Sequence, residues 1–281
     1  MLNEIRYLAA AKINLYLRVL RRLPNGYHEI DTVMQAVSLF DEVILSPRER
    51  GIKLTCSDIS LAREPIKNLA FRAAALFYQR CPNIRTGVNI TLKKNIPIAA
   101  GLAGGSADAA AVLVGMNLLF GAGLSEADLC NLGVRIGMDV PFCIMGGIKR
   151  GQGMGERLSE CEPMPDCRIL IAIGAERINT AEAYKRLSAT GLKEAENTMI
   201  PALESGSLEN VCQNLYNSFE TVTESGNQIK QLMLENGAAG ALMSGSGPAV
   251  FGLFRETPAL ERARAALAEK KYTTFVCRAI N

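Results

Sequence analysis

The most regular alternation of apolar and polar residues lies near the start of the chain. From residue 12 to residue 19, polar side chains beginning with Lys12 and Asn14 alternate with aliphatic ones. Because successive side chains of a strand point to opposite faces, this alternation predicts a strand over residues 5–20 with one face in the core. The other face carries Lys12 and Asn14 two residues apart, and it is either a solvated face or part of a site.

Further periodicities predict the remaining elements. Helical patterns cover residues 68–79, 109–119, 125–136, a segment that begins at Thr180, and residues 207–219, 226–236 and 258–270. One or two strands are expected over residues 32–45 with a turn at Asp41-Glu42, and further strands at residues 87–92, 140–145, 168–173, 249–254 and 272–278. This order of elements predicts an α+β fold in two domains, residues 1–160 and 161–281.

Charge and composition exclude several classes of protein. A net charge of +3 over 281 residues, with no cluster of Lys and Arg, does not favour a nucleic-acid partner. The longest apolar segment, residues 109–124, is interrupted by Asn117 and is too short to span a bilayer. No signal peptide is visible, because Glu4 and Arg6 precede any apolar run. We therefore expect a soluble cytoplasmic protein without a membrane partner.

Cysteine and histidine usage argues against a structural metal. The eight cysteines contain no C-x-x-C pair, and the single histidine cannot build a zinc cluster with several His ligands. This pattern is typical of free thiols in a reducing cytosol.

A glycine-rich loop at residues 97–107 is the strongest candidate for a ligand site. Gly101, Gly104 and Gly105 lie within five residues, and Ser106 follows before an alanine-rich helical segment. Glycines that open a helix let backbone N–H groups approach an anion at the positive end of the helix dipole, which predicts a phosphate site. The spacing matches neither a Walker A loop, nor the G-x-G-x-x-G dinucleotide fingerprint, nor a nucleophile elbow. The alternative is a glycine-tolerant turn before a buried helix.

Asp139 and a second glycine-rich turn complete the set of candidates. Asp139 precedes the apolar segment 140–145, where a strand is expected and a carboxylate would have no packing role. The second turn spans residues 237–248. A phosphate loop, a lysine and a carboxylate suit phosphoryl transfer to an alcohol, which needs held phosphates, positive charge and a proton acceptor.

The chain resembles the GHMP small-molecule kinases at residues 11–17, 97–107 and 243–251. Within them it is similar to the branch that phosphorylates a CDP-linked polyol on the non-mevalonate route to isoprenoid precursors. The segments that carry this resemblance include Ala-Lys12-Ile-Asn14-Leu, Gly-Tyr27-His28-Glu and Gly-Met-Asp139-Val-Pro-Phe. The resemblance implies a ribosomal-S5-like N-terminal domain and a ferredoxin-like C-terminal domain.

The resemblance also implies roles for individual residues. Lys12 and Asp139 match the catalytic pair, in which the carboxylate deprotonates the substrate hydroxyl and the lysine holds charge at the γ-phosphoryl group. Asn68 and Lys94 match positions near the adenine and the phosphates of ATP. The positions that match the ATP-phosphate loop are Pro97, Ile98, Ala99, Ala100, Gly101, Leu102, Ala103, Gly104, Gly105, Ser106 and Ala107. The positions that match the substrate site are Asn14, Tyr27, His28, Thr180 and Tyr184, of which Tyr27, His28 and Tyr184 would hold the cytosine.

One departure from the family pattern concerns the metal. The family loop usually has a second serine where this chain has Ala107, so Mg²⁺ is expected with ATP but its ligands are unassigned.

Two other classes of protein remain open at this point. One is a homoserine- or mevalonate-type kinase, which the Tyr27-His28 pair disfavours because those substrates have no base. The other is a nucleotide sensor or S5-like RNA module without turnover, which the retained pair and the small net charge disfavour. The sequence does not indicate an oligomeric state.

Overall fold

The computed structural model describes residues 2–174, 180–189 and 195–281. Contacts within the chain divide it into two units. Unit 1 consists of Met1–Ala11, Leu39–Ile98 and Ala103–Met145, and unit 2 of Lys12–Ser38, Ala99–Leu102 and Gly146–Asn281. These units are discontinuous along the chain, so they are a different division from the domain boundary near residue 160, which stays a prediction.

Strands β1 (Ile5–Arg22) and β2 (His28–Arg48) each contribute one part to unit 1 and one part to unit 2. The strand over residues 5–20 is thus confirmed. The turn predicted at Asp41-Glu42 is wrong, because β2 continues through both residues and Asp41 is fully buried. The adjacent acidic residues Asp41 and Glu42 indicated a turn, but Lys94, which is distant in the sequence, pairs with Asp41 inside unit 1.

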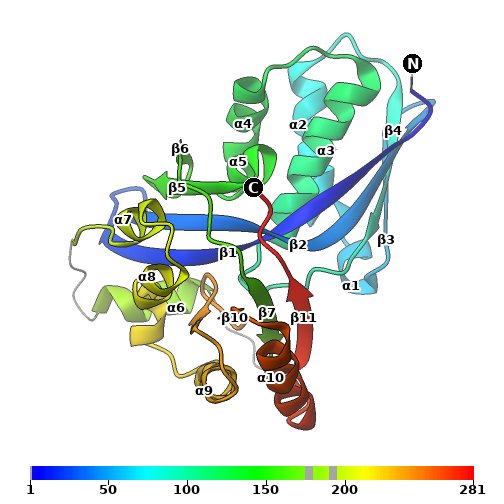
Figure 1. The fold of residues 1–281 in the computed structure, drawn as a ribbon. Coiled ribbons are helices and arrows are strands. Elements are labelled where there is room, and N and C mark those ends of the chain that lie inside the picture. Colours follow the sequence, from blue (N-terminus) through cyan, green and yellow to red (C-terminus); the bar gives the residue numbers. More distant parts are fainter. Residues whose placement is uncertain (1, 175–179, 190–194) are drawn as a thin grey trace. The chain divides into compact units, whose positions relative to one another are not determined.

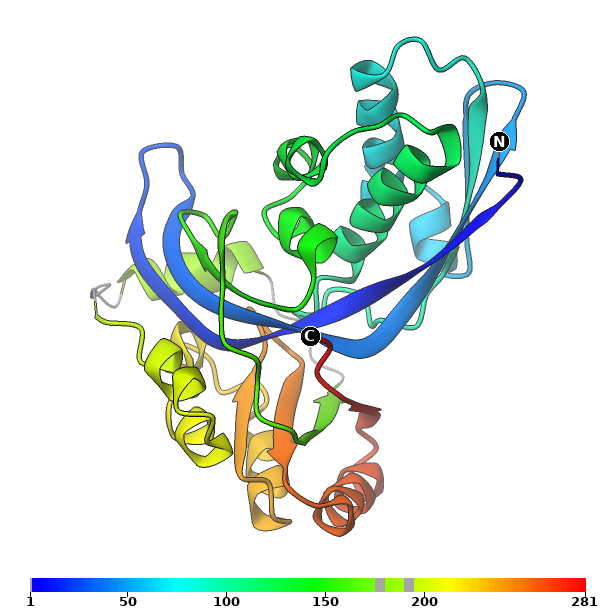
Figure 2. The ribbon, with the colours of Figure 1, turned by 45° about the horizontal axis from the view of Figure 1, so that its top comes forward.

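The described part of unit 1 contains a mixed sheet and five α-helices. The sheet has the order β3-β4-β2-β1, with β3 parallel to β4 and β4 antiparallel to β2. Helices α2 and α3 pack side by side, as Figures 1 and 2 both show. The remaining elements are β3 (Ile52–Cys56), α1 (Ile59–Ala62), a 3₁₀ turn (Pro65–Lys67), α2 (Leu69–Arg80), β4 (Gly87–Lys93), α3 (Gly104–Phe120), α4 (Glu126–Val134) and α5 (Val140–Met145).

Local capping signals explain where two of these helices begin. The Asn68 side chain accepts a hydrogen bond from the Ala70 N–H and caps α2. Ser125 and Asp128 form a reciprocal capping box at the start of α4, within the segment 125–136 that the sequence predicts as helical. The strand predicted over residues 140–145 is wrong, because this segment is the short helix α5. A short apolar run is compatible with either element, and here it packs as a helix against α3 and α4.

Unit 2 contains the other part of the first sheet and a separate four-stranded sheet. In this part of the first sheet, β8 is parallel to β1, β5 is antiparallel to β2, and β6 is antiparallel to β5. The second sheet is antiparallel with the order β11-β7-β10-β9. The elements are β5 (Ile148–Gln152), β6 (Arg157–Glu160), β7 (Arg168–Ile173), α6 (Thr180–Ala189), α7 (Met199–Glu204), α8 (Leu208–Gln213), β8 (Tyr216–Asn217), a 3₁₀ turn (Ser218–Thr221), α9 (Asn227–Glu235), β9 (Gly240–Met243), β10 (Val250–Phe254), α10 (Thr257–Glu269) and β11 (Thr273–Cys277).

The four-stranded sheet has a ferredoxin-like topology. Its fourth, first, third and second strands in chain order lie side by side, and helices connect the first strand to the second and the third to the fourth. Helices α9 and α10 pack against this sheet, where Leu260 and Leu267 join Leu170 and Phe254 in one buried cluster. The expected α+β class is therefore confirmed. The helix predicted over residues 207–219 is only partly correct, since α8 ends at Gln213.

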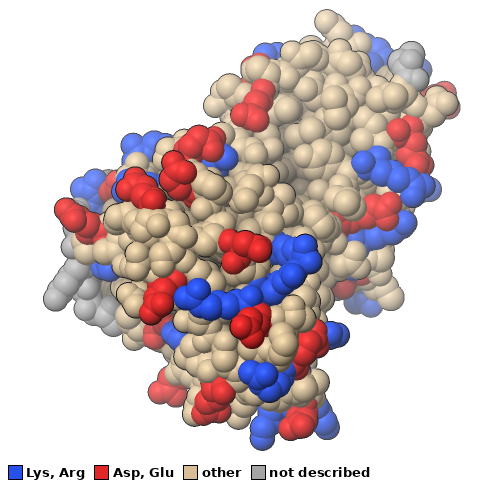
Figure 3. Space-filling view, in the orientation of Figure 1, with Lys and Arg blue, Asp and Glu red and all other residues tan. Residues whose placement is uncertain are grey.

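Surface and helix composition add two observations. Acidic and basic side chains are interspersed over the face seen in Figure 3. Among the residues that the structure describes, no helix is both long and apolar enough to cross a membrane.

Candidate functional site

The predicted phosphate loop has an unusual backbone. Ala99, Gly101 and Ala103 have positive φ angles of 54°, 81° and 57°. A left-handed conformation costs alanine about 1–2 kcal/mol, so the surrounding structure must hold these residues in place. Alternation of this conformation along a chain favours concavities lined by N–H groups. Helix α3 then begins at Gly104 without a capping side chain, and the first N–H groups of any helix have no partner inside it.

The second glycine-rich turn holds the first loop within unit 2. The Ser244 hydroxyl donates to the Gly101 carbonyl oxygen at 3.0 Å, and the Ala249 N–H donates to the Ala100 oxygen at 3.1 Å. A Cβ atom at Gly101 would lie 2.1 Å from the Ser244 carbonyl oxygen. Glycine at position 101 is therefore required by this contact as well as by its positive φ.

Lys12 and Asn14 form the polar centre of unit 2, and they are not on a solvated face. Lys12 is 4% exposed and Asn14 is 2% exposed. The Lys12 Nζ donates to Asn14 Oδ1 at 2.6 Å, and the Gly245 N–H donates to the same oxygen at 3.0 Å. Asn14 Nδ2 donates to the Thr32 hydroxyl at 2.8 Å. The predicted substrate contact of Asn14 stays a prediction, and the structure shows its amide already engaged by protein groups.

Asp139 belongs to unit 1 and follows a segment that approaches the start of α3. It immediately precedes α5, and its carbonyl oxygen accepts a hydrogen bond from the Cys143 N–H. Two residues earlier, a Cβ atom at Gly137 would lie 3.7 Å from the Ser106 hydroxyl oxygen. The half-buried Asp139 is thus held near the expected phosphate loop. The premise that no helix follows Asp139 is wrong, so a capping role is an alternative that experiment must separate from catalysis.

Lys12 belongs to unit 2 and Asp139 to unit 1. Their action as a pair is a prediction. Two other expected site residues lie at the starts of helices. Asn68 caps α2 through its side chain, and Thr180 begins α6, where its side chain lies outside the described part.

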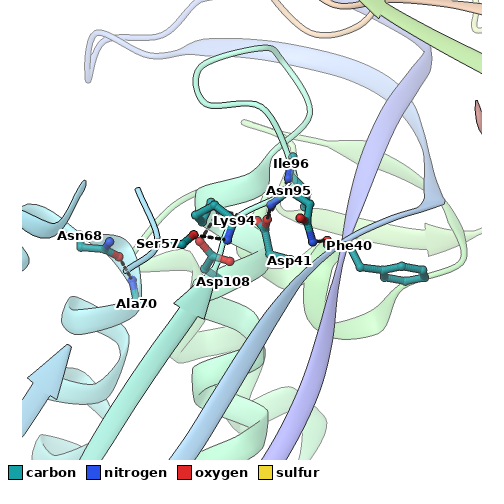
Figure 4. A network of polar contacts seen from close by, with 9 residues as sticks. All are labelled: Phe40, Asp41, Ser57, Asn68, Ala70, Lys94, Asn95, Ile96 and Asp108. Atoms are coloured by element: carbon teal, nitrogen blue, oxygen red, sulfur yellow. Dashed lines mark hydrogen bonds and ion pairs between the residues drawn. The ribbon is translucent and has the colours of Figure 1, made fainter. Parts of the chain in front are cut away.

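Lys94 is enclosed by two buried carboxylates (Figure 4). Its ammonium donates to Asp41 Oδ2 and, at 2.6 Å, to Asp108 Oδ2. A Cβ atom at Gly104 would lie 3.5 Å from Lys94 Nζ, which places the ammonium beside the first residue of α3. Burial alone would lower the pKa of Lys94, but the two carboxylates raise it above its ordinary value. Lys94 therefore keeps its charge next to the loop, as the predicted phosphate contact requires.

The residues of this cluster do not fit a divalent cation. Both carboxylates are bound to the Lys94 ammonium, which occupies the place that a metal would take. Among the described residues, no group of three or more His, Cys, Asp or Glu side chains could hold a metal ion. Ala107, where the family usually has serine, is 2% exposed. The ligands of the expected Mg²⁺ therefore stay unassigned.

The burial of the Asp108 carboxyl group should make the stability of the protein depend on pH. Its Oδ1 is buried without a hydrogen-bond partner among the described residues. Burial raises the pKa of Asp108 to about 7, while Lys94 opposes the rise and Asp41 adds to it. Between about pH 4 and pH 7 the folded protein therefore keeps a proton that the unfolded chain releases, so this group lowers stability as the pH rises through that range.

Replacing Asp108 by Asn should remove this pH dependence. We expect the free energy of unfolding of the wild type to fall relative to that of Asp108→Asn by about 2–3 kcal/mol between pH 5 and pH 8. Urea unfolding of both proteins at each pH measures the difference, in which the other titrating groups cancel. Parallel curves for the two proteins would show that Asp108 is ionised over the whole range.

The expected base-binding residues meet on one side of unit 2. The rings of His28 and Tyr184 are stacked, with centroids 4.6 Å apart and planes 20° apart. Phe219 contacts the edge of this stack, with its centroid 4.8 Å from that of Tyr184. Tyr27 is 55% exposed. The structure thus brings His28 and Tyr184 together and leaves Tyr27 at the surface.

Comparison with known proteins identifies the family. Residues 68–147 match the family model of the GHMP kinases N terminal domain, and residues 199–273 match that of the GHMP kinases C terminal domain. A 4-diphosphocytidyl-2-C-methyl-D-erythritol kinase of Caldicellulosiruptor saccharolyticus is 44% identical over 253 residues, which cover 88% of this chain and 87% of the relative. The chain belongs to the GHMP kinase family. It therefore has the two-domain GHMP kinase fold and is an ATP-dependent kinase.

Two solved structures with different substrates in their names share this fold. A 4-(cytidine 5'-diphospho)-2C-methyl-D-erythritol kinase superposes with a TM-score of 0.82 at 31% identity, covering 99% of this chain and all of the other. A homoserine kinase from Cytophaga hutchinsonii superposes with a TM-score of 0.75 at 18% identity, covering 100% of this chain and 95% of the other. The second likeness shows the fold alone.

Sequence reasoning missed several residues that organise the GHMP kinase site. Asp41 was assigned to a turn and Asp108 was not among the candidate residues, although both are buried partners of Lys94. Thr32 and Ser244 were not considered, although they hold Asn14 and Gly101. The detectable signal was a polar residue inside an apolar run, in β2 for Thr32 and Asp41 and in α3 for Asp108, but the partners of these side chains lie elsewhere in the sequence.

Proposed function

We propose that this GHMP kinase transfers the γ-phosphoryl group of ATP to a hydroxyl of 4-diphosphocytidyl-2-C-methyl-D-erythritol. This step belongs to the non-mevalonate pathway of isoprenoid precursor synthesis. The observation that carries the proposal is the 44% identity over 88% of the chain to a relative with that name. The stacked pair of His28 and Tyr184 supports it, because a CDP-linked acceptor has a base that such a surface can hold.

The proposed roles follow from the chemistry of phosphoryl transfer. Asp139 accepts the proton of the attacking hydroxyl, and the buried Lys12 ammonium stabilises negative charge on the transferring group. The N–H groups at the start of α3, with Ser106 among its first residues, bind the phosphates of ATP. Lys94, fixed between Asp41 and Asp108, supplies positive charge beside them.

Hydrogen-bond directions show which ring nitrogen of His28 carries a proton. The Ser188 hydroxyl donates to the Tyr184 carbonyl oxygen at 2.9 Å, so it accepts from His28 Nε2 at 2.8 Å. Burial, assisted by Arg22, lowers the pKa of His28 below its ordinary value and favours the neutral ring. A neutral His28 with its proton on Nε2 has Nδ1 as its acceptor. An exocyclic amino group, as in cytosine, is a suitable donor to that atom.

His28→Ala should therefore weaken binding of the CDP-linked substrate selectively. Loss of base stacking is worth about 1–3 kcal/mol, which raises the KM for the acceptor roughly fivefold to a hundredfold, while the KM for ATP stays within about twofold. Steady-state kinetics with each substrate varied in turn measure both values. An increase in the KM for ATP alone would place the cytosine elsewhere and contradict the proposed acceptor site.

A homoserine- or mevalonate-type acceptor is less well supported, because those compounds have no base for His28 and Tyr184. We further propose a cytoplasmic location, because the eight cysteines contain no C-x-x-C pair and this usage is typical of a reducing compartment. A nucleic-acid partner is not part of the proposal, because the net charge is only +3.

A further inference from the structure

The buried side chain of Thr32 lies at the start of a chain of hydrogen bonds that ends at Lys12. The Thr32 hydroxyl donates to the Tyr16 carbonyl oxygen at 2.7 Å. A carbonyl oxygen can only accept, so the single hydroxyl proton of Thr32 is committed to this bond. The hydroxyl oxygen must then act as an acceptor towards Asn14.

This direction determines how the Asn14 amide is oriented. Only Nδ2 can donate to Thr32, so Oδ1 must point the other way. There Oδ1 accepts from the Lys12 ammonium at 2.6 Å and from the Gly245 N–H at 3.0 Å. The reversed amide would place an NH₂ group against two donors and lose both bonds. The orientation of Asn14 therefore follows from donor and acceptor chemistry, which decides what atomic positions alone leave ambiguous.

We propose that Thr32 is a positioning residue for the kinase reaction, because its hydroxyl orients Asn14 so that Asn14 Oδ1 holds the Lys12 ammonium. The inference rests on the proposed role of Lys12 in phosphoryl transfer. Thr32 is 1% exposed, and its register partner in β5 is Gly151, so Thr32 lies inside the protein and does not touch substrate. It acts through Asn14 and Lys12.

The Thr32 methyl group has a separate, structural contact. A Cβ atom at Gly151 would lie 3.2 Å from Thr32 Cγ2, so the methyl fills the space beside this glycine. Valine keeps a methyl at this position and replaces the hydroxyl by a second one. Serine keeps the hydroxyl and loses the methyl. The two substitutions therefore separate the positioning role from packing.

Steady-state kinetics of Thr32→Val and Thr32→Ser provide the test. We expect Thr32→Val to lower kcat about tenfold to hundredfold, as misplacement of a reacting group does, with both KM values within about threefold of wild type. Thr32→Ser should keep kcat within about threefold of wild type. A wild-type kcat in Thr32→Val, or equal losses in both variants, would overturn the proposal. If Thr32→Val does not fold, Thr32→Ser and Thr32→Ala differ in the same hydroxyl, and an equal kcat in that pair overturns it.

A measurement that needs no substrate separates this inference from the proposed function. In nitrogen-15 NMR spectra, the Asn14 NH₂ protons should exchange slowly with water in the wild type and Thr32→Ser, and faster in Thr32→Val. Unchanged exchange in Thr32→Val would contradict the orienting role even if the kinase activity is confirmed. Slow exchange that depends on the hydroxyl, in a protein that does not phosphorylate the CDP-linked polyol, would instead contradict the proposed function alone.

Discussion

Asp139→Asn should lower kcat by about 10²–10⁴-fold, which is the usual value of a positioned general base. The amide cannot accept the hydroxyl proton, but it has nearly the same size as the carboxylate. Affinity for ATP and for the acceptor should stay near wild type, because binding does not need the proton acceptor. Single-turnover kinetics and calorimetric titrations measure these quantities separately.

The position of Asp139 before α5 requires a matched control for a capping role. Asparagine caps helices about as well as aspartate does, whereas alanine does not, at a cost of about 1 kcal/mol. A catalytic Asp139 predicts that Asp139→Asn and Asp139→Ala lose similar activity. A structural Asp139 predicts that only Asp139→Ala loses stability and that Asp139→Asn keeps its kcat.

Lys12 provides the second half of this prediction. Lys12→Met should reduce kcat to a similar extent, and the double variant with Asp139→Asn should lose little more than either single variant. Residues that act on one transition state as a unit are strongly non-additive. Fully multiplicative losses would show that the two residues act independently.

Gly101→Ala should abolish ATP binding and lower thermal stability. An added Cβ would lie 2.1 Å from the Ser244 carbonyl oxygen, and the φ of 81° costs alanine about 1–3 kcal/mol in addition. The contact between the two glycine-rich turns would have to open, and the loop would lose the shape that presents its N–H groups. Calorimetry with ATP and a thermal melt measure the two effects.

Gly105→Ala is the matched control in the same loop. A Cβ atom at Gly105 would meet only Leu69, at an ordinary distance of 3.4 Å, and alanine favours the helix that begins there. This variant should keep its fold. Gly104 is less suitable, because its Cβ would press against Ile96 at 2.9 Å and test packing instead of phosphate binding. Equal stability of Gly101→Ala and Gly105→Ala would contradict the contact with Ser244.

Features set by neighbouring residues were predictable from the sequence. Ser125 and Asp128 mark the start of α4 because a capping box needs only residues three apart. Alternation from Lys12 predicts β1 for the same reason. The resemblance to GHMP kinases, which depends on short motifs, supplied the family and the candidate residues.

Features that depend on distant partners could not be predicted in this way. The acidic Asp41 suggested a turn, but Lys94, 53 residues later, stabilises it inside β2. The six apolar residues of α5 have no period that separates a helix from a strand. The link from Thr32 through Asn14 to Lys12 requires β1 and β2 to lie side by side, which local sequence does not reveal.

Phosphorus NMR of reaction mixtures tests the central claim most directly. The protein, ATP and Mg²⁺ would be incubated separately with 4-diphosphocytidyl-2-C-methyl-D-erythritol, with homoserine and with mevalonate. We predict a new phosphomonoester signal only with the first acceptor, accompanied by an equal amount of ADP and by unchanged signals of the CDP diphosphate. Equal phosphorylation of homoserine or mevalonate, or release of inorganic phosphate without a phosphorylated acceptor, would contradict the account.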